Sequence, residues 1–146
     1  MEYISKNLTL QEVMTSQTAI RLNIKNVPTS KEIENLKYIA EKIFQPIRAH
    51  FDVPIRISSG YRSKELNKAV GGSKNSQHIT GQALDIQGTN GVKNSQIFEY
   101  IKKYLIFDQL IWEFGDDKEP AWVHVSLRKN EPNRGNILVI GSTKKV

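Results

Sequence analysis

The stretch Ser76-Gln-His-Ile-Thr-Gly-Gln-Ala-Leu-Asp-Ile86 carries two side chains that can bind a metal ion, His78 and Asp85. Gly81 lies between them and allows the chain to reverse direction. Asp85 has an apolar residue on each side, so in an alternating strand it points away from the face that these neighbours bury. Taken singly, His78 is equally consistent with an ordinary loop residue, and Asp85 with a solvated charge on a strand.

A second histidine, His124, lies in the strand-like run Trp122-Val-His-Val-Ser126. The chain has three histidines and no cysteine, so a transition-metal site must be built from His, Asp and Glu. Two imidazoles and a carboxylate suit a zinc ion that keeps its fourth position for water. A lone histidine among apolar neighbours is more often a core residue, but the three residues together favour a metal site.

Length and composition indicate one folded domain over residues 1–146, with a core over about 8–140 and a basic tail over 141–146. A chain of 146 residues buries roughly two-thirds of its unfolded surface without disulfides. The net charge of +6 suits either a solvated basic surface or attraction to a polyanion. Aromatic residues do not alternate with the basic ones as they do on nucleic-acid surfaces, so no nucleic-acid partner is expected.

The first residues lack the basic and apolar regions of an export signal, and no stretch approaches the roughly 20 apolar residues of a membrane span. We therefore expect no export signal, no membrane span and a monomer. A phage or prophage protein, or a bacterial protein without its signal, would fit these expectations.

Apolar spacing and turn residues predict a single α+β domain in which helices pack against a small, mostly antiparallel sheet. Thr29 and Glu32 form a capping box at the start of the clearest helix, and Pro46 should bend or end that helix. Residues 115–120 suit a long hairpin loop. The expected helices cover residues 7–22, 29–49, 63–70 and 92–105, and the expected strands cover 53–59, 83–87, 109–114, 122–127 and 136–140.

Five short motifs together resemble the zinc D-alanyl-D-alanine peptidases, a family of cell-wall peptidases that share their core fold with the hedgehog signalling domain. The resemblance extends from about Leu8 to Leu127, and its most specific part is S-x-H-x-x-G-x-A-x-D followed by a strand histidine. The motifs are Ser58-Ser-Gly-Tyr-Arg-Ser63, Asn67, Val70-Gly-Gly72, Ser76–Ile86 and Trp122–Ser126.

The resemblance implies roles for individual residues. His78, Asp85 and His124 match the family's zinc ligands, and Arg62 matches an arginine that faces the substrate and the developing oxyanion. A guanidinium suits that role because its paired donors can hold a carboxylate or tetrahedral negative charge; a surface salt bridge is the alternative for Arg62. The remaining matches are Ser76 and Gln77, which would line the mouth of the pocket, and Tyr61, which suits either the core or the pocket.

The chain departs from the family pattern at the residue that carries the proton. Zinc lowers the pKa of bound water towards about 7, and a carboxylate takes the proton and returns it to the leaving amine. Much of the family has an acid three positions before the last histidine, where this chain has Ala121. Glu113, at the end of the strand expected to pair with the His124 strand, is the best substitute. Three loop acids are rivals, namely Asp116, Asp117 and Glu119.

These features predict a zinc peptidase that cleaves peptidoglycan stem peptides or cross-links next to D-amino acids, as a carboxypeptidase or an endopeptidase. Ala121 favours a second hypothesis, a zinc-containing module that binds the cell wall or a protein without turnover. A third hypothesis, a nucleic-acid-binding protein, is supported only by the positive net charge.

Overall fold

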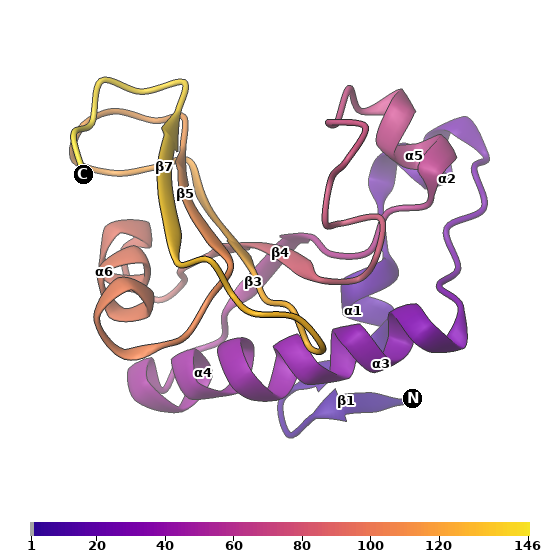
Figure 1. The fold of residues 1–146 in the computed structure, drawn as a ribbon, viewed down its shortest axis with the longest axis horizontal. Helices are drawn as coiled ribbons and strands as arrows, with labels where there is room; N and C mark the ends of the chain where they lie inside the picture. The colour runs from indigo at the N-terminus through magenta and orange to yellow at the C-terminus, as the bar shows by residue number, and fades with distance from the viewer. Residues whose placement is uncertain (1) are drawn as a thin grey trace.

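The computed structural model describes residues 2–146 and has an α+β fold built on a five-stranded sheet in the order β3-β4-β6-β5-β7 (Figure 1). Neighbouring strands are antiparallel except for β5 and β7, which are parallel, so the expected mostly antiparallel sheet is confirmed. In the described part of the chain, no helix has the length and apolarity to cross a membrane. The strands are β3 (Arg56–Ser59), β4 (Ala83–Gln87), β5 (Gln109–Glu113), β6 (Trp122–Ser126) and β7 (Asn136–Ile140).

The expected helix over residues 29–49 is longer than predicted and contains a π-helical turn. It consists of α3 (Ser30–Ile39), the π segment η1 (Ala40–Phe44) and α4 (Gln45–Phe51). Within η1, the backbone N–H of Gln45 donates to the carbonyl of Ala40, one residue further back than in an α-helix. Pro46 has no N–H and follows this widened turn directly, so the chain continues past the proline as helix instead of ending there.

The helical segment expected over residues 7–22 consists of two short helices and not of one continuous helix. The segment begins with a small hairpin of β1 (Tyr3–Ser5) and β2 (Leu8–Thr9), followed by the short helices α1 (Leu10–Met14) and α2 (Gln17–Leu22). Thr9 caps α1 in a capping box with Glu12, and the Ser16 side chain then accepts a hydrogen bond from the Ala19 N–H. This second cap starts a new helix, which explains the break.

Helices cover one face of the sheet and leave the other open. In Figure 1, α3 and α4 run as one rod below the sheet, and α6 (Asn94–Tyr104) packs against β4, β5 and β6. The rings of Phe98 on α6 and Trp112 on β5 meet edge to face with centroids 5.2 Å apart. The buried core combines Leu36, Ile39, Ile43, Ile47, Ile97, Phe98 and Ile101 from the helices with Leu84, Ile86, Leu110, Trp112, Val123 and Val125 from the strands.

Strand alternation places the polar candidates on the open face. Asp85 on β4 pairs with His124 on β6, which pairs with Ile111 on β5, which pairs with Leu138 on β7. Since paired residues point to the same side of a sheet, these four side chains form one row across the open face. The short helix α5 (Lys64–Ala69) and the loop from Val70 to Gln82 lie at the β4 end of this row.

Gly81 holds the loop before β4 against α3. It has φ +75°, and a Cβ atom there would lie 2.6 Å from the Glu32 carbonyl oxygen. Gly91 has a similar φ of +88° but open space around it. We expect Gly81→Ala to lower the free energy of unfolding by about 3 kcal/mol, and Gly91→Ala by about 1 kcal/mol, since only the former adds a backbone collision to left-handed strain. Denaturant titration measures both; equal losses would contradict close packing at Gly81.

Candidate metal centre

Three buried side chains from different parts of the chain converge on the open face. The potential ligand atoms of His78, Asp85 and His124 all lie within 4.8 Å of one another. The Nε2 atom of His78 is 3.3 Å from Asp85 Oδ2, and the Nδ1 atom of His124 is 2.9 Å from Asp85 Oδ1. Two nitrogen donors and a carboxylate at this spacing are suited to a metal ion such as zinc.

A hydrogen bond fixes the orientation of the His78 ring. Its Nδ1 atom lies 2.7 Å from the Gly60 carbonyl oxygen. Since a carbonyl can only accept, Nδ1 carries the proton and the lone pair of Nε2 remains free. That Nε2 atom is buried and has no hydrogen-bond partner among the described residues. An orphaned, buried lone pair that points at a carboxylate and a second imidazole fits a metal ligand whose other nitrogen is held by the backbone.

Neighbouring groups keep the Asp85 carboxylate ionised, and burial keeps the His78 imidazole neutral. Burial by itself raises the pKa of Asp85, but the neighbouring His78 and His124 outweigh it and hold that pKa well below its ordinary value. Burial lowers the pKa of His78 despite the nearby Asp85. An ionised carboxylate and a neutral imidazole are the forms that bind metal ions.

Arg62 is held beside the centre by three side chains. Its Nε donates to Ser59 Oγ at 3.0 Å, one terminal nitrogen donates to Asn67 Oδ1 at 3.2 Å, and the other lies 3.5 Å from Asp85 Oδ2. Its backbone N–H donates to the His78 carbonyl oxygen. The side chain is therefore a partly buried, oriented cation in contact with Asp85, which differs from the surface salt bridge considered as its alternative.

Glu113 reaches the centre from the other side. It pairs with Trp122 across the β5–β6 hairpin, as expected, and its Oε1 atom lies 3.9 Å from His124 Nδ1. The Ala121 N–H donates to the Glu113 carbonyl, so the two positions are neighbours in space. Burial, followed by the negative charge of Asp85, raises the pKa of Glu113 above its ordinary value. A carboxylate with a raised pKa is suited to accepting and returning a proton.

Two of the three rival acids are engaged elsewhere. Asp116 accepts hydrogen bonds from the backbone N–H groups of Lys118 and Glu119 within the hairpin loop. The Glu119 carboxylate accepts from the backbone and hydroxyl of Ser95 in the first turn of α6. Asp117 is exposed on the same loop. Of the four acids, Glu113 is the one in contact with His124.

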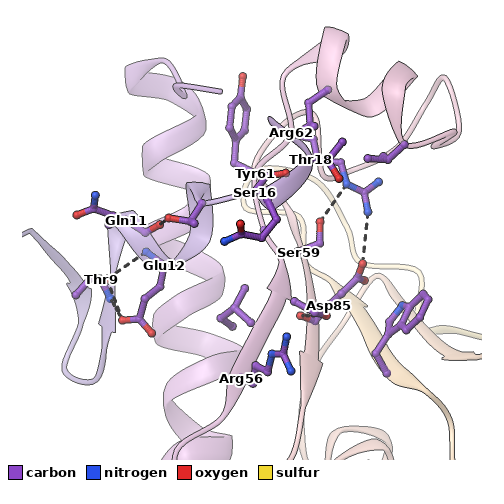
Figure 2. Close-up of a pocket in the computed structure, with 18 of the residues that line it drawn as sticks. Thr9, Gln11, Glu12, Ser16, Thr18, Arg56, Ser59, Tyr61, Arg62 and Asp85 are labelled. Atoms are coloured by element: carbon purple, nitrogen blue, oxygen red, sulfur yellow. Dashed lines mark hydrogen bonds and ion pairs between the residues drawn. The ribbon is translucent and has the colours of Figure 1, made fainter. Parts of the chain in front are cut away.

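A groove of about 950 Å³ leads to the centre along β3. In Figure 2, Arg62 reaches both Ser59 and Asp85 on one side of it, and residues of the N-terminal helices, such as Gln11 and Ser16, line the other. Tyr61 also lines the groove, but its side chain is 8% exposed and belongs to the core cluster. Tyr61 therefore packs in the core and also borders the groove, which are the two alternatives considered from the sequence.

Ser76 and Gln77 precede His78 and support the loop that carries it. The Ser76 hydroxyl accepts from the His78 N–H, and Gln77 Nε2 donates to Asp108 Oδ2 at 3.0 Å. The remaining side-chain atom of Gln77, Oε1, is buried without a partner among the described residues. Gln77 therefore connects the loop of His78 to a buried carboxylate at the start of β5.

Asp108 was not identified from the sequence. It is fully buried and accepts hydrogen bonds from the backbone, Nε and Nη2 of Arg134, and it lies 3.4 Å from Arg128 Nε. These arginines belong to the segment between β6 and β7. The one sequence signal was an acid directly before an apolar strand, Phe107-Asp108-Gln109-Leu110, and a single acid at that position does not predict distant arginine partners.

Comparison with protein families gives one match that covers most of the chain. The family model described as Peptidase M15 matches residues 6–126, a range that contains all three residues of the cluster together with Arg62 and Glu113. A comparison with curated proteins gives no match.

We expect Asp108→Asn to lower the free energy of unfolding by about 3 kcal/mol at neutral pH, because two arginines lose a buried charged partner. Arginine contacts hold the pKa of Asp108 at about 2, below its ordinary 3.8. The ionised form therefore contributes stability above about pH 4, and this contribution is lost as the pH falls towards 2. Thermal unfolding of both proteins at several pH values should show the difference narrowing in that range. Asp117→Asn, on the exposed loop, is the control, and a difference independent of pH would refute this role.

Proposed function

The chain belongs to the Peptidase M15 family of zinc-dependent metallopeptidases, and we propose that it hydrolyses amide bonds next to D-amino acids in peptidoglycan stem peptides or their cross-links. The observation that supports this proposal best is the buried His78, Asp85 and His124 cluster with Glu113 and Arg62 on opposite sides. The basic surface, with a net charge of +6, is compatible with a polyanionic cell wall.

In this proposal His78 holds zinc through Nε2, Asp85 through its carboxylate and His124 through Nδ1. These are the atoms that face one another in the cluster. The Gly60 carbonyl keeps the His78 ring in the tautomer that leaves Nε2 free. Zinc, when bound, supplies a Lewis acid that polarises the scissile carbonyl and lowers the pKa of a water molecule towards about 7.

Glu113 moves the proton. Its raised pKa and its position 3.9 Å from His124 suit a group that accepts a proton from water and returns it to the leaving nitrogen. Arg62 acts from the opposite side of the cluster. Its guanidinium, oriented by Ser59 and Asn67, stabilises negative charge on the carbonyl oxygen or holds a substrate carboxylate.

A second candidate function is a zinc-containing module that binds the cell wall or a protein without cleaving it. The observation in its favour is Ala121, which stands where much of the family has its acid. In the peptidase Glu113 carries the proton in place of an acid at position 121. In the binding module no residue carries it, and no bond is cleaved.

We expect the zinc-loaded protein to release peptides from purified peptidoglycan, with each cleaved amide giving a new carboxyl and a new amino end. Glu113→Gln should lower the rate about a hundredfold or more, because the amide cannot accept the proton, while zinc stays bound in a 1:1 ratio. Mass spectrometry of the released peptides and metal analysis of the same samples give both quantities.

Asp117→Asn is the matched control, since this rival acid is exposed on the hairpin loop, and its rate should stay within about twofold of wild type. If wild type and Glu113→Gln are equally inert on walls of several chemical types with zinc bound, the binding module is the better description. If Asp117→Asn is the inactive variant, the assignment of the base to Glu113 is wrong.

A further inference from the structure

The open face of the sheet continues past the metal centre onto β7. One row of side chains crosses four strands and consists of Asp85, His124, Ile111 and Leu138. A second row lies next to it, two residues away along each strand, and consists of Trp122, Glu113 and Ile140. Leu138 and Ile140 are 41% and 44% exposed. Beyond the centre, on the side of Glu113, the sheet therefore presents two partly exposed apolar side chains on β7.

Phe114 adds an aromatic side chain to this surface at the cost of backbone strain. Its φ is +56°, a left-handed conformation that is uncommon for a bulky residue. Its N–H donates to the Ile140 carbonyl, and its ring packs on Trp122 with centroids 5.2 Å apart. Gly141 lies against the ring, since a Cβ atom there would come within 2.2 Å of it. Although held from two sides, Phe114 is 44% exposed. Strain at such a position is typical of functional sites.

The order of Arg62, His124 and Glu113 across the sheet indicates how the substrate is oriented. Arg62 contacts Asp85 on β4, His124 follows on β6, and Glu113 follows on β5. Because Glu113 gives its proton to the leaving nitrogen, that nitrogen lies at the β5 side of His124. The acyl part of the substrate then lies towards Arg62 and the groove along β3, whose volume of about 950 Å³ is ample for a peptide.

The residues beside Glu113 disfavour a leaving group that carries a carboxylate next to its nitrogen. A terminal D-alanine carries a carboxylate next to its leaving nitrogen and needs a cation close by. The residues that flank Glu113 on the open face, Trp122 and Ile140, are uncharged, and Glu113 is itself an acid. Arg62, the cation in contact with Asp85, lies on the far side of His124 from Glu113. When the leaving nitrogen is instead the side-chain amine of a diamino acid, the carboxylate of that residue lies several carbons away. The methylene groups between them then face the apolar surface.

Resting on the proposed function, we infer that Ile140, Leu138 and Phe114 form the leaving-group subsite for the aliphatic arm of a diamino acid. Trp122, on which Phe114 packs, also lines the groove and lies between the groove and this subsite. The bond cleaved is then a cross-link, in which the carbonyl of one stem peptide is joined to the side-chain amine of the next. Water adds its hydroxyl to that carbonyl carbon, the C–N bond breaks, and the second proton passes through Glu113 to the departing amine. The enzyme is in this view an endopeptidase for cross-links and not a carboxypeptidase.

The test compares two peptides with the zinc-loaded protein, a cross-linked dimer of stem peptides and a linear stem that ends in D-alanyl-D-alanine. Wild type should cleave the dimer at least about tenfold more efficiently. Ile140→Thr should raise KM for the dimer about tenfold with little change in kcat, because an apolar contact is worth about that much in specificity. Phe114→Gly, which removes the ring and relieves the left-handed strain, should also raise KM for the dimer. Ile106→Thr is the matched control, since Ile106 is 76% exposed just before the opposite end of β5.

Calorimetry with Glu113→Gln, alone and combined with Ile140→Thr, measures binding of the dimer without turnover, and the second change should weaken it about tenfold. Cleavage of neither peptide by wild type would defeat the proposed function itself. Cleavage of both peptides with equal efficiency, or equal effects of Ile140→Thr and Ile106→Thr, would overturn the subsite and leave the peptidase standing. A dimer of the protein that Ile140→Thr dissociates in sedimentation experiments would assign this surface to a second copy, and would also overturn the subsite.

Discussion

The register between β4 and β6 is the constraint on which the rest of this molecule depends. Asp85 pairs with His124, while Leu84 and Ile86 on one strand and Val123 and Val125 on the other point into the core. Because side chains alternate along a strand, a slip by one residue would bury the carboxylate and the imidazole among helices and expose four apolar side chains. The hydrophobic effect that folds the sheet is thus also what places two of the proposed ligands on its open face.

The sequence predicted the parts of the site that depend on strand alternation and on hairpin pairing. Asp85 and His124 each stand between two apolar residues in a strand-like run, and the hairpin between residues 113 and 122 follows from two such runs joined by a single loop. Other features depend on partners distant in the chain. The two arginines around Asp108, the parallel pairing of β7 with β5 and the hydrogen bond from His78 to Gly60 have no local signal. The break between α1 and α2 did have one, because Ser16 is a good cap in the middle of the apparent helix.

Two carboxylates of the site are given opposite properties by their surroundings. Asp85 lies between two histidines and Arg62, and its pKa falls well below the ordinary value. Glu113 is partly buried next to the charge of Asp85, and its pKa rises. In the proposed mechanism Asp85 binds the metal ion and Glu113 carries the proton, and these opposite pKa shifts suit the two roles.

The central claim is that His78, Asp85 and His124 hold one zinc ion on the open face, and the X-ray absorption spectrum of the zinc-loaded protein tests it most directly. The third histidine, His50, stacks on Tyr100 with ring centroids 4.3 Å apart and takes no part in the cluster. We expect one zinc per chain with two imidazole nitrogens and oxygen ligands at about 2.0–2.2 Å. A spectrum with no imidazole or with three would contradict it.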